Sequence, residues 1–307
     1  MNSNSKIYIA GHSGMVGSAI VRALIKKGYH NLIFKKSNEL DLTIQSDVLK
    51  FFSDEKPDYV FLAAAKVGGI LANDTYGAQF IYENLMIQSN IINASHINNV
   101  KKLLFLGSSC IYPKGVLNPI KEDYLLDGKL EKTNEAYSIA KISGLKMCEY
   151  YNKQYGCNYY SLMPTNLYGP NDNYDLDNSH VLPALLKKMH YAKKNKSKEV
   201  IVWGSGLPKR EFLHVDDLAS ACIFIMENNF EEKLFNVGTG EEISILNLAK
   251  LIKNIVGYEG EIMLDKSKPD GLMKKLIDSS KIKKLGWNFK INLEEGIKNT
   301  YKNQFLK

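Results

Sequence analysis

The chain has 307 residues, of which 45% are hydrophobic and 24% charged, and its formal net charge is +7 at pH 7. This composition is ordinary for a globular protein, and no apolar stretch approaches the roughly 18 residues needed to cross a bilayer. Because the lysines are spread along the chain without interleaved aromatic residues, we expect binding to neither nucleic acid nor membrane, and a mild preference for small anionic ligands.

The four cysteines form no C-x-x-C pair and have no zinc-ligand spacing. This usage predicts free thiols in a reducing compartment, without a disulfide framework or a metal site. The N-terminal M-N-S-N-S-K leads directly into a strand-like run and lacks the charged-then-apolar pattern of a signal peptide. We therefore expect a cytoplasmic protein.

The first predicted strand covers residues 6–10 and runs into the glycine turn G-H-S-G-M-V-G at 11–17, which precedes a helical pattern over 18–27. Glycines at this place let the backbone approach a pyrophosphate at the N-terminus of the helix. Strand, turn and helix in this order predict a dinucleotide site, with cofactor contacts from Gly11, Gly14, Met15, Val16 and Gly17.

A second strand is predicted over residues 31–35, and basic residues follow it. An acidic residue here would hold a ribose 2′-hydroxyl and favour NAD, whereas basic residues favour the 2′-phosphate of NADP. The two lysines favour NADP(H), although NAD(H) use and a merely solvated strand edge stay open as alternatives. The cofactor contacts expected from this region are Lys35, Lys36, Ser37, Asp41 and Leu42.

Two further buried strands are predicted over residues 59–64 and 103–106, with a long helix over 80–97 between them. Repeated alternation of strand and helix argues for an α/β fold with a doubly wound parallel sheet, whose ligands bind beyond the carboxyl ends of the strands. At those ends we expect Ala63, Ala64, Leu106 and Gly107 to contact the cofactor.

The stretch T-N-E-A-Y-S-I-A-K at 133–141 places Tyr137 four residues before Lys141. On a helix this spacing puts both side chains on one face, where the lysine charge can stabilise a tyrosine anion. Taken alone, such a pair is more often part of an ordinary solvated helix face. The glycine turn and the serines at 108 and 109 make it more specific.

A strand over residues 159–163 is followed by P-T-N-L-Y-G-P at 164–170, where two prolines and a glycine predict an irregular loop at the ligand-binding edge. From it we expect cofactor contacts by Pro164, Asn166 and Leu167. A helix is predicted to begin within 177–186, and strands are predicted over 200–203 and 234–237.

These elements divide into two predicted domains. We expect an NADP-binding Rossmann-type domain to comprise residues 1–165 together with about 207–238. Residues 166–206 and 239–307 are expected to form a smaller C-terminal α/β domain that binds a nucleotide sugar.

The combined motifs resemble the extended short-chain dehydrogenase/reductase superfamily. Within it, nearly the whole chain is similar to the GDP-L-fucose synthase family, on the motifs G-S-S-C-I-Y-P-K (107–114), M-P-T-N-L-Y-G-P-N-D-N (163–173), V-W-G-S-G (202–206) and R-E-F-L-H-V-D-D (210–217). The resemblance implies an NADPH-dependent 3,5-epimerase and 4-reductase of a GDP-linked 4-keto-6-deoxy sugar, acting as a homodimer through helices near 80–97 and 135–153.

The resemblance also implies roles for individual residues. Cys110 would be the base and His180 the acid of epimerisation. In the reduction, Ser108 would hydrogen-bond the C4 carbonyl and Tyr137 would donate the proton, while Lys141 lowers the pKa of Tyr137 and holds the nicotinamide ribose. The expected substrate contacts are Lys188, Trp203, Arg210 and Asp270. Taken without the motifs, Cys110 and His180 would more often be structural residues, and Trp203 a core residue.

The sequence departs from the family pattern at several places. Serines stand at 13 and 37 where arginines are common, Leu-Met-Lys at 272–274 replaces a Thr-Pro-Arg type sequence, and Y-D-L-D-N-S-H differs before the histidine at 180. Lys188 also stands where arginine is frequent, which keeps the charge but loses the guanidinium fork. An alternative is therefore a C4 reductase of a related GDP-4-keto-6-deoxy-heptose that does not epimerise. A less favoured one is an NAD-dependent nucleotide-sugar 4-epimerase or dehydratase.

Overall fold

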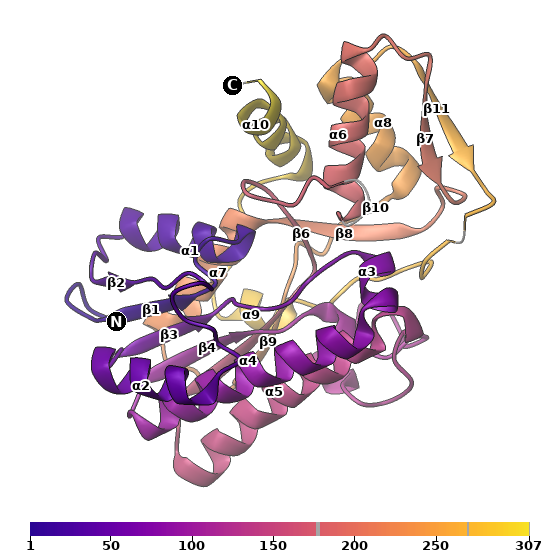
Figure 1. Cartoon of the computed structure of the whole chain (residues 1–307). Helices are drawn as coiled ribbons and strands as arrows, with labels where there is room; N and C mark the ends of the chain where they lie inside the picture. The colour runs from indigo at the N-terminus through magenta and orange to yellow at the C-terminus, as the bar shows by residue number, and fades with distance from the viewer. Residues whose placement is uncertain (176–178, 269, 307) are drawn as a thin grey trace.

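The computed structural model describes residues 1–175, 179–268 and 270–306 (Figure 1). A six-stranded sheet forms its centre, in the order β2-β1-β3-β4-β5-β9 with every pair parallel. These strands are apolar over almost their whole length because helices cover both faces of the sheet. Their bounds are β1 (Ile7–Ala10), β2 (Leu32–Ile33), β3 (Tyr59–Leu62), β4 (Lys102–Leu106), β5 (Tyr159–Pro164) and β9 (Leu234–Val237).

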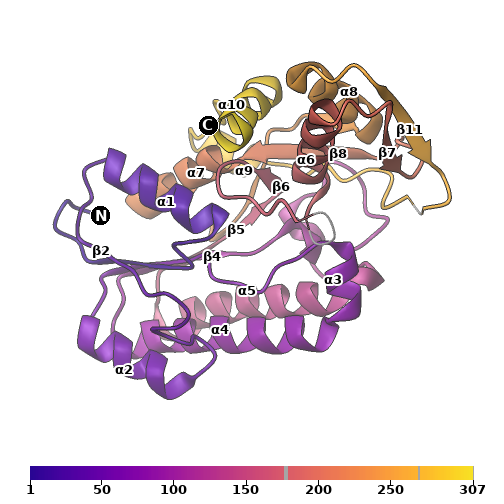
Figure 2. The ribbon, with the colours of Figure 1, turned by 45° about the horizontal axis from the view of Figure 1, so that its top comes forward.

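Two layers of helices enclose this sheet, as both ribbon views show (Figures 1 and 2). One face packs against α1 (Met15–Lys26) and α7 (Val215–Glu227) through an apolar cluster that includes Ile20, Leu24 and Leu218. The other face packs against α2 (Gln45–Glu55), α4 (Gly77–Ile97) and α5 (Glu135–Tyr155). The predicted α/β fold with a doubly wound parallel sheet is therefore confirmed.

A second, smaller lobe contains the remaining sheets and three helices, around a separate apolar core. Its strands form a three-stranded sheet in the order β10-β8-β6 and a parallel pair, β11 with β7. The elements of this lobe are β6 (Asn166–Tyr168), α6 (Val181–Lys194), β7 (Glu199–Trp203), β8 (Lys209–His214), β10 (Glu242–Ser244), α8 (Ile245–Val256), β11 (Glu261–Asp265) and α10 (Leu293–Phe305).

The remaining elements are short. They are α3 (Ile70–Thr75), α9 (Ser280–Lys284) and the 3-10 turns η1 (Ser109–Ile111), η2 (Glu122–Tyr124) and η3 (Lys132–Asn134). Ile282 and Trp287, near the C-terminal end, pack into the cluster on the α1 side of the central sheet. The proposed domain boundaries stay a prediction.

The prediction of an irregular loop over 164–170 was wrong in part. Pro164 ends β5 and pairs with Val237, and Asn166–Tyr168 forms β6 beside β8. A proline lacks only its own backbone N–H donor, so Pro164 can end β5. The three residues of β6 then fit between the two prolines and pair in a different sheet. Other boundaries moved less: β2 has only two residues and α1 begins at Met15. The predicted helix start at 177 falls outside the described residues, and α6 begins at Val181.

All four cysteines are free thiols in the structure. Within the described ranges, no helix is long and apolar enough to span a membrane.

Candidate functional site

The glycine turn after β1 is tightly packed. Gly11 has φ +82°, and a Cβ atom on it would lie 2.7 Å from the backbone nitrogen of Ala64. A Cβ atom on Gly17 would lie 2.0 Å from the carbonyl oxygen of Gly11. Only glycine fits these two positions, so the turn between β1 and α1 keeps its close path past the end of β3.

The N-terminus of α1 fits a pyrophosphate. Its N-cap residue, Gly14, provides no side-chain hydrogen bond, so the amides of Met15 and Val16 in the first turn have no side-chain cap. The Nδ1 atom of His12, in the same turn, is buried without a hydrogen-bond partner. Unused donors at an uncapped helix start are what a dinucleotide cofactor requires.

The basic segment after β2 lies at the surface. Lys35 is half-buried, whereas Lys36 and Ser37 are exposed. No ion pair joins either lysine to a carboxylate in the part of the chain that the structure describes, so both charges are available to an anion. Asp41 instead accepts hydrogen bonds from the hydroxyl and backbone amide of Thr43, which lower its pKa. The carbonyl of Leu42 accepts a bond from Asn90.

Other predicted cofactor contacts lie at the carboxyl ends of β3, β4 and β5. Ala63 and Ala64 follow β3 and are half-buried, and Leu106 ends β4. Gly107 comes next, where a Cβ atom would lie 2.2 Å from the Cε atom of Met163. After β5, the Asn166 side chain donates to the carbonyl of Glu211 at 2.8 Å, which ties this segment to β8. Pro164 and Leu167 flank that position.

Ser108, Cys110 and Tyr137 form one cluster between η1 and α5. The Ser108 hydroxyl accepts a bond from the Cys110 backbone nitrogen at 3.2 Å. Ser138 on α5 donates to the Cys110 carbonyl at 3.0 Å, which holds the turn against the helix. Burial and the charge of Cys110 raise the pKa of Tyr137, and a hydrogen bond with Ser108 opposes this rise only partly.

Lys141 lies one turn after Tyr137 and is buried, with 3% of its surface exposed. Its Nζ atom donates to the Leu106 carbonyl at 2.8 Å and lies 5.8 Å from the Tyr137 ring centroid. Burial lowers the pKa of Lys141 from 10.5 to about 7. Burial is the largest cause of the raised pKa of Tyr137, and the Lys141 ammonium group donates its hydrogen bond to Leu106, so the expected lowering of the tyrosine pKa by Lys141 stays a prediction.

His180 lies in the second lobe as the N-cap residue of α6. Its side chain is exposed, yet the surrounding protein desolvates the imidazole enough to lower its pKa. Residues 176–178, half of the divergent stretch 174–179 before it, lie outside the described residues. The position of His180 relative to Cys110 therefore stays part of the prediction.

The four predicted substrate contacts lie in the second lobe and in the segment after β11. The ammonium groups of Lys188 and Lys268 each lie 5.5 Å from the ring centroid of Trp203, which is 63% exposed. An exposed indole between two cations can bind a planar or anionic group, and core packing is not its role. Arg210 donates to the carbonyls of Lys209 and Leu272.

Asp270 is fixed by a neighbouring loop. Its carboxylate accepts bonds from the backbone nitrogen and the hydroxyl of Ser205, which lower its pKa. The charge of Asp270 also acts on Arg210. These contacts connect the predicted substrate residues on β8 with the segment that follows β11.

One residue of this site was absent from the sequence prediction. The Nζ atom of Lys275 lies 3.5 Å from the Sγ atom of Cys110, and both residues line a cavity of about 280 Å³. Leu272, Met273 and Lys274, the stretch that departs from the family pattern, line the same cavity. The two adjacent lysines at 274 and 275 are visible in the sequence. Their proximity to Cys110 is not, because Cys110 lies far from them along the chain.

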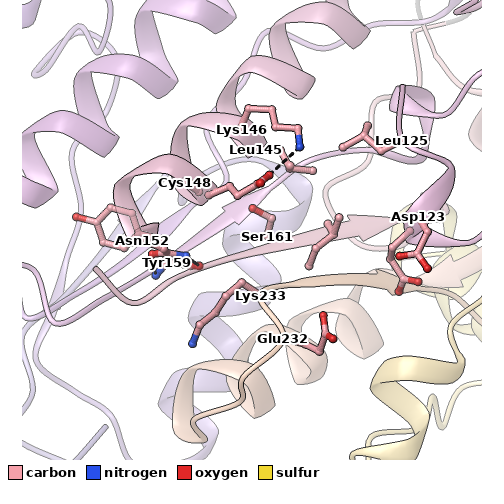
Figure 3. Close-up of a pocket in the computed structure, with 13 residues that line it drawn as sticks. Asp123, Leu125, Leu145, Lys146, Cys148, Asn152, Tyr159, Ser161, Glu232 and Lys233 are labelled. Atoms are coloured by element: carbon pink, nitrogen blue, oxygen red, sulfur yellow. Dashed lines mark hydrogen bonds and ion pairs between the residues drawn. The ribbon is translucent and has the colours of Figure 1, made fainter. Parts of the chain in front are cut away.

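A second cavity, of about 340 Å³, lies between α5, β5 and the segment before β9 (Figure 3). Leu145, Cys148 and Ser161 line it, and the ion pair between Lys146 and Glu149 lies beside it. None of the predicted site residues contributes to this cavity, so it gives no argument about the chemistry. The described ranges contain no group of three or more His, Cys, Asp or Glu side chains that could hold a metal ion.

Comparisons with known proteins agree over nearly the whole chain. The model of the NAD dependent epimerase/dehydratase family matches residues 7–238. GDP-L-fucose synthase 1 of Arabidopsis thaliana is 56% identical over 300 residues, which cover 98% of this chain and 93% of the plant protein. GDP-L-fucose synthase of Escherichia coli (strain K12) is 54% identical over 308 residues, covering 97% and 96%.

Solved structures are similar as well. A GDP-mannoheptose C4 reductase from Campylobacter jejuni with NADP bound has a TM-score of 0.92 to this chain at 47% identity, and the match covers 98% of each chain.

Proposed function

Since this chain belongs to the NAD dependent epimerase/dehydratase family, we propose that it is an NADPH-dependent reductase of C4 in a GDP-linked 4-keto-6-deoxy sugar, and that it also inverts C3 and C5. The resemblance to GDP-L-fucose synthases is confirmed by relatives at 54% and 56% identity. The observation that carries the proposal is the joint position of Ser108, Cys110 and Tyr137, with Lys141 one helical turn away.

NADP(H) is the cofactor, and when bound it supplies the hydride for C4. The residues proposed to hold it match its chemical groups, because the uncapped start of α1 suits the pyrophosphate and Lys35 and Lys36 suit the 2′-phosphate. Lys141 would hold the nicotinamide ribose from the base of the crevice. Burial of the Lys141 charge is unfavourable in free energy, and a further hydrogen-bond acceptor on the ribose would reduce this cost.

Tyr137 serves as proton donor in the reduction. A carbonyl oxygen that gains negative charge needs an acid nearby, and a phenol with a raised pKa is fully protonated at neutral pH. Ser108 lies beside it and would hydrogen-bond the same oxygen. Tyr137 would return to its protonated form by uptake of a proton from solvent.

Cys110 and His180 are proposed for the inversion. The protons at C3 and C5 are acidic because the adjacent carbonyl stabilises the carbanion as an enolate. A Cys110 thiolate would accept such a proton, the electrons of the C–H bond would pass into the enolate, and His180 would return a proton to the opposite face. The lowered pKa of the Cys110 thiol favours its role as base near neutral pH.

A second candidate function is reduction of C4 without epimerisation, on a GDP-linked heptose. It is favoured by the similarity to the Campylobacter jejuni GDP-mannoheptose C4 reductase and by the Leu272–Lys274 stretch on the wall of the Cys110 cavity. Both candidates use Tyr137, Ser108 and NADPH in the same way. They differ in whether Cys110 removes a proton.

Deuterium exchange separates the two. The protein is incubated with GDP-4-keto-6-deoxy-mannose in deuterated water without cofactor, and we expect deuterium at C3 and C5. Cys110→Ser should abolish the exchange, whereas Cys157→Ser, which alters a thiol outside the site, should not. Absence of exchange in the wild-type protein would exclude the epimerase. In a second experiment the protein receives hexose and heptose substrates, each with NADPH and with NADH, and NMR identifies the products. Net consumption of NADPH distinguishes a reductase from a 4-epimerase or dehydratase that retains its NAD.

We also propose a cytoplasmic homodimer. Its support is a pair of long helices, α4 and α5, that lie side by side (Figure 2) and expose large apolar side chains, among them Tyr82 and Tyr150. Exposed large apolar side chains on paired helices support an interface between two copies.

A further inference from the structure

Cys110 contacts a lysine from a distant part of the chain. Lys275 follows β11, and its Nζ atom lies 3.5 Å from the Cys110 Sγ atom. Figure 1 shows the chain returning here from β11 in the second lobe to α9 beside the central sheet. The contact therefore joins the two bodies of the molecule at the edge of the proposed catalytic cluster.

The backbone on the C-terminal side of Lys275 is held on two sides. Ile120 donates to the Leu276 carbonyl and accepts from the Asp278 nitrogen, each at 2.8 Å. The Leu276 nitrogen donates to the Asn118 side chain at 2.8 Å, and the Ile277 nitrogen to the fully buried Glu211 at 3.2 Å. Four bonds over three consecutive residues leave Lys275 little freedom to move away from the thiol.

The charge of Lys275 is not neutralised by a carboxylate. Two neighbouring lysines in the same cavity have acidic partners, Lys274 with Glu242 and Lys114 with Glu131, each at 3.4 Å. For Lys275, no such ion pair exists within 1–175, 179–268 and 270–306. Its ammonium group therefore acts on the sulfur atom.

Apart from Lys275 and the paired charges of Lys114, Glu131 and Lys274 in the same cavity, polar uncharged groups lie near the thiol. Ser108 contacts it from the loop before η1, and Tyr137 faces it from α5. Burial raises the pKa of the Cys110 thiol, but the Lys275 charge and the hydrogen bonds with Ser108 and Lys275 outweigh it, so the pKa is lowered. An unpaired cation at 3.5 Å is the main favourable influence on the anionic form.

We infer that Lys275 is a positioning residue for epimerisation: it acts through Cys110, holding the thiol in its anionic form before the sugar arrives. When the thiol ionises in the free enzyme, its proton passes to water, and the thiolate so formed accepts the proton from C3 or C5. This inference rests on the proposed role of Cys110 as the base. Lys275 itself need not contact the sugar.

The test measures the thiol directly. Iodoacetamide reacts with the thiolate, which displaces iodide and forms a carbon–sulfur bond, and labelling of the Cys110 peptide is followed by mass spectrometry between pH 5 and 10. Lys275→Met should raise the midpoint of this profile by about one pH unit, which lowers the labelling rate by about tenfold at pH values well below the wild-type midpoint and leaves the rate unchanged well above the variant's midpoint. Lys275→Arg should restore most of the wild-type profile. Lys274→Met, which removes a neighbouring but paired lysine, should leave the midpoint unchanged.

Two results would overturn the inference. One is a Lys275→Met profile that superimposes on the wild type; the other is an equal shift in Lys274→Met. Lys275→Gln, which keeps a polar but uncharged side chain one bond shorter than lysine, replaces the methionine variant if that variant does not unfold cooperatively on heating.

Deuterium exchange at C3 and C5 separates this inference from the proposed function. We expect Lys275→Met to slow the exchange at pH 7 by about the same factor as labelling, and the deficit to shrink as the pH rises. Unchanged exchange in that variant would exclude the role of Lys275 and leave the proposed role of Cys110 intact. Absence of exchange in the wild-type protein would exclude the base role of Cys110, and with it the catalytic part of this inference.

Discussion

The ammonium group of Lys141 lies 5.8 Å from the ring centroid of Tyr137, one turn further along α5. Its hydrogen bond goes to the neutral Leu106 carbonyl, and burial lowers its pKa to about 7. The pKa of Tyr137 is raised at the same time. The phenol of Tyr137 is therefore protonated near neutral pH, which is the state required of a proton donor.

Tyr137→Phe removes this donor. Positioned acids contribute about 10²- to 10⁴-fold to rate, so we expect kcat of the C4 reduction to fall by about that factor. NADPH affinity, measured by fluorescence titration, should stay near the wild-type value. Tyr150→Phe, at an exposed position on the same helix, is the matched control. Full reductase activity in Tyr137→Phe would mean that another group donates the proton.

Lys141 should make stability depend on pH. Because its pKa is lowered from 10.5 to about 7 in the folded chain, the unfolded chain binds more protons between these values. The free energy of unfolding of the wild type therefore rises with pH across this window, and the gain is lost as pH falls towards 7. Lys141→Met lacks this contribution. We expect the Tm of the variant, relative to wild type, to be higher at pH 6.5 than at pH 9.5, and a pH-independent difference would contradict the burial argument.

Gly17 and Gly14 form a matched pair in the turn before α1. A Cβ atom at 17 would lie 2.0 Å from the Gly11 carbonyl oxygen, whereas one at 14 would lie 3.6 Å from the same atom. Gly17→Ala should therefore destabilise the protein by about 1–3 kcal/mol through overpacking and weaken NADPH binding. Gly14→Ala should keep the wild-type Tm. Equal denaturation midpoints in urea for both variants would contradict this prediction, because they would show that the turn rearranges to accommodate a methyl group at position 17.

The outer face of α4 and α5 should hold the homodimer together. Tyr82→Glu combined with Tyr150→Glu places two charges among exposed apolar groups, and we expect a monomer by light scattering after size exclusion. Met263→Glu, at an exposed apolar position on β11 in the other lobe, should stay dimeric. A wild-type monomer, or a dimer that survives the double change, would refute this interface.

The central sheet was largely predictable from local patterns. Buried parallel strands are near-continuous apolar runs, and the glycine turn and the spacing of Tyr137 and Lys141 are short-range features. The contact of Lys275 with Cys110 was not predictable, because it depends on long-range hydrogen bonds between the segment after Lys275 and residues near 120 and 211, which no local sequence pattern indicates. The raised pKa of Tyr137 was missed for a related reason. Helical spacing places a lysine near a phenol but says nothing of how much protein surrounds the ring.

The strand β9, Leu234–Val237, completes the central sheet only after the chain has passed through the second lobe, and α7 covers one face just before it. During synthesis, β5 therefore emerges from the ribosome as an open edge with part of one sheet face uncovered. Such an edge can pair with other chains. The first lobe then depends on later residues to close it, so an early translational stop within the second lobe would leave a product prone to aggregation and proteolysis.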